Sequence, residues 1–160
     1  MLITTSRKPS KRTRSFCQYL TRVFDSEYFN RGKMSMHDIF LKLHNSKYLY
    51  ILVVYELNGN PSKMTFFNKE SKECASFLIN VSLPNKRINI NKNNLSFKSD
   101  VNSLSFIKNF LGSFSENFES NVIWIKNCDG FEGVLEVFDN ESQFTGFKIF
   151  IKKHMHYLIY

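Results

Sequence analysis

The apolar run at residues 49–55 (LYILVVY), the longest in this 160-residue chain, limits the possible folds most. It is far shorter than the roughly 20 apolar residues that a membrane-spanning helix needs, so the sequence predicts no transmembrane segment. The wider segment 48–57 is rich in β-branched and aromatic residues and ends at the turn Asn58-Gly59-Asn60-Pro61, which favours a buried strand. The length fits one compact domain, or two small halves that share a core.

Strand-like and helix-like segments alternate along the chain. Residues 2–5 predict a first strand, and the spacing of Phe16, Leu20, Val23 and Phe24 predicts a helix that Ser10 caps. Further strands are expected at 27–30, 48–57, 63–67, 73–79, 86–90, 122–126, 131–138 and 144–152, and further helices after a capping box at 35–38 and over 101–111. The alternation predicts an α/β fold with a boundary at 81–85, so that halves at about 1–80 and 85–160 pack together.

Positive charge is concentrated at the N-terminus. The chain carries 22 Lys and Arg against 14 Asp and Glu, a net charge of +8, and residues 1–33 account for +6 of it. Five of the six arginines lie within residues 7–31, and Arg87 is the sixth. Because a guanidinium pairs with phosphate oxygens through two parallel hydrogen bonds, this clustering indicates a nucleic-acid partner. A solvated basic face without a partner is the alternative.

Motifs for catalysis, metal binding or nucleotide binding are not found. The sequence has no glycine-rich phosphate loop and no paired carboxylates, and His154-Met155-His156 lacks a third metal ligand. Cys17, Cys74 and Cys128 are an odd number without paired spacing, which is typical of reduced, intracellular thiols. We therefore expect no catalytic residue, no metal and no cofactor, and we do not expect an enzyme.

The basic N-terminus also has the composition of a mitochondrial transit peptide. The strand-like start at residues 2–5 and Pro9, which interrupts a helix, disfavour that alternative. No apolar segment follows the charges, so a secretory signal is not expected either. Together with the reduced thiols, this predicts a cytoplasmic protein.

Two strings of the sequence resemble the archaeal Brix-domain proteins of ribosome biogenesis. Residues 4–16 read T-T-S-R-K-P-S-K-R-T-R-S-F, and residues 30–35 read N-R-G-K-M-S. Two shorter matches follow: G-N-P at 59–61 with M-T-F at 64–66, and G-F-K-I-F-I at 146–151. The four matches occur in order over the length of the chain, whereas residues 80–121 depart from the family pattern.

The resemblance implies a single Brix domain over residues 1–160. Its fold would consist of two similar α/β halves, each resembling the anticodon-binding domain of class II aminoacyl-tRNA synthetases. It also implies non-catalytic binding to ribosomal RNA or pre-rRNA during ribosome biogenesis, with another ribosome-assembly protein as a second potential partner and no membrane.

The residues themselves indicate where RNA would bind. Backbone amides and hydroxyls at the junction of the first strand and first helix face a helix N-terminus, where anions bind readily. Basic residues surround this junction. The turn at residues 31–33 follows a strand that we expect beside the first strand, so its basic residues could join them. The candidate RNA-binding residues are Thr5, Ser6, Arg7, Lys8, Ser10, Lys11, Arg12, Arg14, Arg31, Gly32 and Lys33. The alternative is a protein-interaction module of a pre-ribosomal complex, in which the basic patch serves only for steering.

Overall fold

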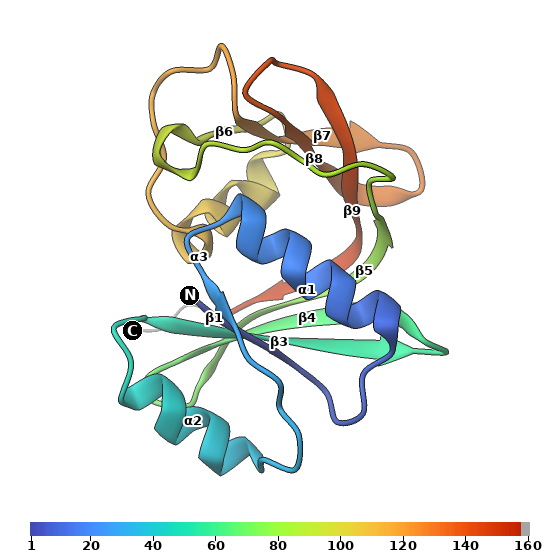
Figure 1. The fold of residues 1–160 in the computed structure, drawn as a ribbon. Helices are drawn as coiled ribbons and strands as arrows, with labels where there is room; N and C mark the ends of the chain where they lie inside the picture. Colours follow the sequence, from blue (N-terminus) through green and yellow to red (C-terminus); the bar gives the residue numbers. More distant parts are fainter. Residues whose placement is uncertain (158–160) are drawn as a thin grey trace. The chain divides into compact units, whose positions relative to one another are not determined.

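The computed structural model of this chain describes residues 1–157, which form a mixed α/β structure of two units (Figure 1). The N-terminal unit comprises Met1–Thr21, Ser26–Leu78 and residues 154–157, and the C-terminal unit comprises Arg22–Asp25 and Ile79–Lys153. Along the chain, the main passage between the units lies inside a strand, between Leu78 and Ile79. Among residues 1–157, no helix is long and apolar enough to cross a membrane.

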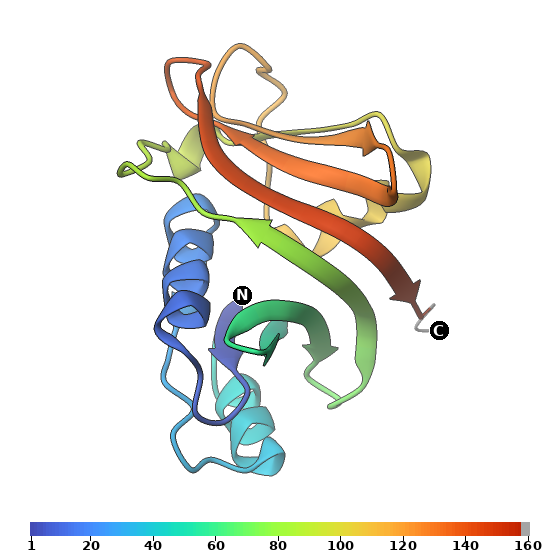
Figure 2. The same ribbon diagram turned by 90° about the vertical axis from the view of Figure 1, so that its right-hand side faces the viewer.

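The N-terminal unit is built on strands in the order β2-β1-β3-β4-β5. Its elements along the chain are β1 (Leu2–Thr5), α1 (Lys11–Val23), β2 (Glu27–Tyr28), α2 (Met36–His44), β3 (Tyr50–Leu57), β4 (Asn60–Asn68) and β5 (Glu73–Ser82). Strand β1 pairs in parallel with β2 and β3, and the other pairs are antiparallel. In the strand order β2-β1-β3, the connection from β1 to β2 runs toward one edge of the sheet, and the connection from β2 to β3 runs toward the other. Right-handed crossovers therefore place α1 and α2 on opposite sides of β1 and β3 (Figures 1 and 2).

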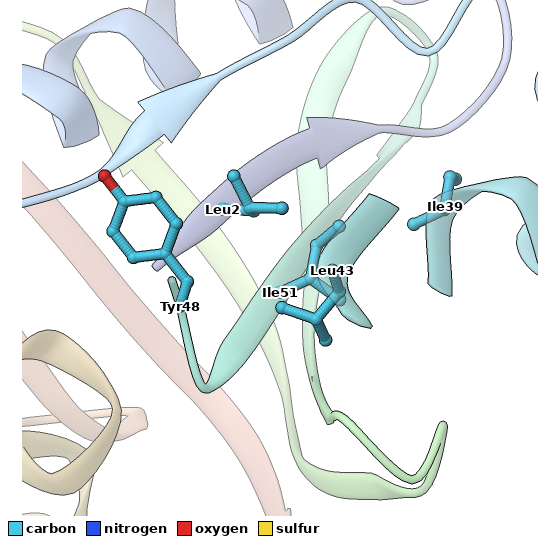
Figure 3. Packing of buried hydrophobic residues seen from close by; sticks show 5 residues of the cluster. All are labelled: Leu2, Ile39, Leu43, Tyr48 and Ile51. Carbon is cyan, nitrogen blue, oxygen red and sulfur yellow. The ribbon is translucent and has the colours of Figure 1, made fainter. Parts of the chain in front are cut away.

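Helix α2 closes a small core on one side of these strands. Ile39 and Leu43 pack with Leu2, Tyr48 and Ile51 (Figure 3). The helix starts at the capping box predicted from the sequence: the Ser35 hydroxyl accepts from the Asp38 N–H, and the Asp38 carboxylate accepts from the Ser35 N–H.

Helix α1 also begins and packs as the sequence predicts. The Ser10 hydroxyl accepts a hydrogen bond from the Thr13 N–H at 3.1 Å, which caps the first turn. The predicted apolar stripe of Phe16, Leu20, Val23 and Phe24 is fully buried. Lys11, Arg12, Arg14 and Arg22 lie on the exposed side of the helix.

The C-terminal unit has strands in the order β9-β8-β7-β6. Its elements are η1 (Lys92–Asn94), β6 (Ser96–Ser99), η2 (Asn102–Ile107), α3 (Lys108–Leu111), β7 (Val122–Cys128), β8 (Phe131–Phe138) and β9 (Phe144–His156). Strand β6 pairs in parallel with β7, and β7, β8 and β9 are antiparallel. A single parallel bridge joins Ser96 to Ser115 on the other edge of β6. Each unit thus has a strand with parallel partners on both edges, followed by an antiparallel meander.

The helix predicted over 101–111 occurs as a 3₁₀ segment, η2, followed by one turn of α-helix, α3. Its apolar stripe of Leu104, Ile107, Phe110 and Leu111 is buried as predicted. Leu104 lies so close to β8 that a Cβ added to Gly133 would come within 2.7 Å of its Cδ1 atom. Glycine at position 133 therefore permits η2 to pack against the sheet.

The strand predicted at 86–90 is wrong. Its backbone makes an isolated hydrogen bond to a loop: the Asn89 carbonyl accepts from the Asn140 N–H at 3.2 Å. Ile88 is buried, so its alternating pattern reflects local burial without a neighbouring strand. Strand β6 occurs instead at Ser96–Ser99, where one apolar residue gives little sequence signal and pairing with β7 sets the conformation.

Candidate nucleic-acid interface

A basic cavity of about 740 Å³ opens in the N-terminal unit. It is formed where three segments meet: the loop after β1, the first turns of α1 and the turn after β2. Its lining residues are Arg7, Lys8, Pro9, Arg14, Asn30, Arg31, Gly32 and Lys33. Five of the eight are basic and none is acidic. Six are residues that the sequence predicts for RNA binding.

Parallel strand pairing brings these segments together. Leu2 of β1 pairs with Glu27 of β2, and Ile3 pairs with Tyr28, so the two strands run side by side in the same direction. The loops that follow their carboxyl ends, residues 7–9 and 30–33, consequently emerge at the same edge of the sheet. This edge is where open α/β sheets commonly bind ligands.

Arg31 is the most buried of the basic residues that line the cavity. Only 9% of its surface is exposed, and its Nε donates to the Met34 carbonyl at 3.1 Å. Among residues 1–157, no carboxylate forms a salt bridge with Arg31. A guanidinium pairs with phosphate oxygens through two parallel hydrogen bonds, and a guanidinium held in place by its own Nε–H bond needs little reordering to do so. Arg31 is therefore the side chain of this cavity best placed to anchor an anion.

Two residues of the lining have left-handed backbone conformations. Lys8 has a φ of 52° and Gly32 has a φ of 56°. Glycine adopts such a φ without steric cost, and a Cβ at Gly32 would meet no atom within 4 Å, so the turn leaves open space beside its backbone. For Lys8 the conformation is unusual, and residues held in such conformations cluster at binding sites.

The helix N-terminus that the sequence offers as an anion site is already occupied. The Glu56 carboxylate accepts hydrogen bonds from the Ser10 N–H at 2.8 Å and from the Thr13 hydroxyl at 2.6 Å. Burial raises the pKa of Glu56, but the hydrogen bonds from Thr13 and Ser10 outweigh it and lower the pKa below its ordinary value. The cations of the cavity, rather than the start of α1, would therefore meet a bound anion.

The other predicted residues lie outside the cavity lining. Thr5 is buried, and the Ser6 N–H donates to the Val54 carbonyl at 2.8 Å, so both hold the end of β1 in place. Ser10 caps α1 and also donates its hydroxyl to the Gly59 carbonyl. Lys11 and Arg12 are exposed on α1.

Comparison with known proteins gives the family of the chain. No protein-family model matches it. A protein of Methanothermobacter thermautotrophicus, described as a probable Brix domain-containing ribosomal biogenesis protein, is 33% identical over 153 residues, which are 95% of this chain and 96% of the relative. This chain belongs to the Brix-domain ribosomal biogenesis proteins. A Saccharolobus solfataricus protein with the same description is 38% identical over 136 residues, covering 81% of this Brix-domain protein and 76% of the relative.

Solved structures agree with the membership. The crystal structure of Mil, an archaeal Imp4-like protein, matches 98% of this Brix-domain protein and 99% of its own chain, with a TM-score of 0.85 and 33% identity. A probable ribosomal biogenesis protein from Aeropyrum pernix has the same fold at 22% identity, with a TM-score of 0.68 over 95% of this chain and 94% of its own. The predicted resemblance to archaeal Brix-domain proteins is confirmed.

Pro9 and Asn30 line the cavity although they were not among the candidate residues of this Brix-domain protein. Asn30 Oδ1 accepts from the Tyr28 hydroxyl at 3.0 Å, and the Pro9 carbonyl accepts from Arg14 Nη1 at 3.0 Å. Both residues lie inside the two strings that carry the family resemblance, which is the signal that could have identified them. Within residues 1–157, no group of three His, Cys, Asp or Glu side chains is placed to hold a metal ion.

Proposed function

We propose that this Brix-domain protein binds ribosomal RNA or its precursor during ribosome biogenesis without catalysing a reaction. The observation that carries the proposal is the cavity at the ends of β1 and β2, whose lining has five basic side chains and no acidic one. Arg31 would bind a phosphate at the wall of the cavity, and the exposed Arg7, Lys8 and Lys33 would meet neighbouring phosphates.

The lining predicts how such binding would depend on RNA sequence and salt. It contains no aromatic ring on which a base could stack, so its ligand groups are phosphates. Phosphate contacts position a protein on nucleic acid without reading bases. Binding through the cavity should therefore be similar for different RNA sequences. It should weaken as salt increases, because the basic side chains of the protein displace counterions from the RNA phosphates.

The proposal has three further parts: the domain organisation, the cellular location and a second partner. We propose that residues 1–160 form one Brix domain with two similar halves, near 1–80 and 85–160; the same order of parallel and antiparallel strands in both units supports the similarity of the halves. From the family resemblance, we also propose that each half resembles the anticodon-binding domain of class II aminoacyl-tRNA synthetases. We place the protein in the cytoplasm, in line with three free thiols. Another ribosome-assembly protein is a second potential partner.

The first prediction concerns Arg7, which is exposed and lines the cavity. Arg7→Ala should weaken binding to a structured rRNA fragment and should reduce the slope of log affinity against log salt by somewhat less than one unit, the contribution of one phosphate. Filter binding at several salt concentrations measures both quantities.

Arg87→Ala is the matched control, because Arg87 is exposed and lies outside the cavity lining. Arg12→Ala, on the exposed side of α1, should have a smaller effect than Arg7→Ala. Equal losses in Arg7→Ala and Arg87→Ala would mean diffuse attraction by the net charge, and the cavity would no longer be the site.

A further inference from the structure

The sheet of the C-terminal unit carries a row of polar and aromatic side chains on one face. Lys98 of β6 pairs with Trp124 of β7, Trp124 with Glu136 of β8, and Glu136 with Lys148 of β9. Because residues directly opposite in neighbouring strands project from the same face, these four side chains cross the sheet in one line. Phe138 and Phe144, opposite each other on β8 and β9, lie beside this line. Lys126, two residues after Trp124 on β7, and Asp100, just after β6, contact the Trp124 side chain. We call the surface formed by these eight residues the aromatic–lysine face.

The other face of the same sheet forms the core of the unit. Ile123, Ile125, Leu135 and Val137 are buried there, and Leu104 of η2 reaches Gly133 from that side. The aromatic–lysine face is more open. Phe144 is 44% exposed, and the Lys126 and Lys148 side chains are 31% and 32% exposed. Trp124 and Phe138 are half-buried on this face, so none of its three rings belongs to the buried core of the unit.

Cations and rings alternate over this face at short distances. Lys98 Nζ lies 4.0 Å and Lys126 Nζ 4.2 Å from the centre of the Trp124 ring, and Lys148 Nζ lies 4.9 Å from the centre of the Phe144 ring. The Phe138 ring is 6.1 Å from Trp124 and 5.8 Å from Phe144, so the three rings form a continuous group. Such contacts are attractive, and they hold ammonium groups beside rings.

The carboxylates of this face are occupied by its own residues. Glu136 accepts from Lys126 at 2.7 Å and from Lys148 at 2.9 Å, and Asp100 accepts from the Trp124 indole N–H at 2.8 Å. Three lysines against two paired carboxylates leave an excess of positive charge. The face is therefore complementary to an anionic partner that also offers flat, apolar groups.

We propose that the aromatic–lysine face binds unpaired nucleotides of single-stranded RNA. Nucleobases would stack on Trp124, Phe138 and Phe144. Lys98 would turn from the Trp124 ring toward a phosphate, and Lys126 and Lys148 would keep their bonds to Glu136 and offer their other N–H groups to phosphates. Rings that stack bases and cations that follow the backbone are what single-stranded nucleic acid requires of a protein surface. An acidic peptide would use the lysines but has no need of three adjacent rings. The site is separate from the basic cavity, which offers cations and no rings.

Trp124 is the only tryptophan of the chain, so its fluorescence reports on this face alone. The experiment titrates the full chain with single-stranded oligoadenylate of about ten nucleotides, within the usual site sizes for such surfaces. Stacking should quench Trp124 fluorescence with a saturating curve. Phe144→Ala should raise the midpoint about fivefold or more, as expected for the loss of one stacking ring. Leu49→Ala, which removes an exposed apolar side chain of the N-terminal unit, should leave the midpoint unchanged.

Two further titrations separate the possible occupants. Inorganic polyphosphate offers charge without bases and should cause little quenching, and polyglutamate represents an acidic protein segment and should do the same. If either quenches Trp124 as strongly as oligoadenylate, the lysines merely collect anions or bind a protein partner, and the proposal is overturned. It is overturned equally if oligoadenylate causes no quenching, or if Phe144→Ala keeps the circular dichroism of the parent chain and binds as tightly.

Discussion

At the scale of single residues, Glu56 links the hairpin of β3 and β4 to the start of α1. Its carboxylate accepts from Ser10 and Thr13, and the Ser10 hydroxyl donates to the Gly59 carbonyl at 2.8 Å. Asn58 and Gly59 both have positive φ, as a type I′ hairpin turn requires, and this turn holds the Gly59 carbonyl in place for the Ser10 hydroxyl. These bonds fix the end of the loop that carries Arg7 and Lys8.

The second prediction follows from the lowered pKa of Glu56. A carboxyl whose pKa is lower in the folded chain stabilises the fold above its unfolded pKa, and this stabilisation disappears as the pH falls through the folded pKa. Glu56→Gln keeps an oxygen that can accept from Ser10 and Thr13 but removes its charge, so it should cost about 1 kcal/mol at pH 7, the usual difference between hydrogen bonds to charged and to neutral groups. The difference from the parent chain should shrink below pH 4.5, the ordinary pKa of the carboxyl. Urea unfolding at a series of pH values measures it; a difference independent of pH would contradict the role of the ionised carboxylate.

At the scale of elements, α1 combines packing and charge on one helix. Its buried stripe of Phe16, Leu20 and Val23 recurs with helical spacing, and its bases fall between these positions. The helix can thus present Arg14 to the cavity while its apolar side remains inside. The apolar stripe and the positions of the basic residues both depend only on neighbouring residues in the sequence. The helix was therefore predicted correctly.

The third prediction tests the buried stripe. Leu20→Ala removes a fully buried side chain and should lower the free energy of unfolding by about 2–5 kcal/mol, as large-to-small core changes do. Gln18→Ala, at an exposed position of the same helix, should change it by less than about 0.5 kcal/mol. Chemical denaturation monitored by circular dichroism compares the two. Similar small losses for both variants would mean that Leu20 does not face the core.

At the scale of the whole molecule, the two units present different surfaces. The N-terminal unit has a cavity lined by basic side chains and by no aromatic ring. The C-terminal unit has lysines next to aromatic rings on one face of its sheet. The proposed ligands differ accordingly: phosphates at the cavity and unpaired bases at the sheet. An RNA with both structured and single-stranded parts would suit such a protein.

The fourth prediction uses the three free cysteines as reporters of the folded state. Cys17 and Cys74 are buried, and burial raises the pKa of Cys17 to about 12 and raises that of Cys74. Since the thiolate is the reactive form, both should react with a thiol reagent only after unfolding. Cys128 is half-buried and should react in the native chain. Counting labelled thiols by mass spectrometry with and without denaturant tests this; fast labelling of all three in the native chain would contradict the buried positions.

Local patterns in the sequence determined most of the elements and part of the site. The stripe of α1, the capping box of α2 and the strand at Phe131–Phe138 each depend on neighbouring residues, and the structure has them as predicted. The clustering of arginines within residues 7–31 indicated the basic site, because the position of each charge along the chain can be read from the sequence. The resemblance to Brix-domain proteins was likewise carried by short continuous strings.

Only the tertiary structure decided which residues meet. Pairing with β7 makes a strand of Ser96–Ser99, whereas residues 86–90 have an alternating pattern and no partner strand. Glu56 occupies the start of α1 from a strand 46 residues away, which no local pattern announces. The parallel pairing of β1 with β2 brings residues 7–9 beside 30–33, and the register of β6 to β9 aligns Lys98, Trp124 and Lys148. Hydrogen bonds between distant segments fix these arrangements, and they form only when the sheet does.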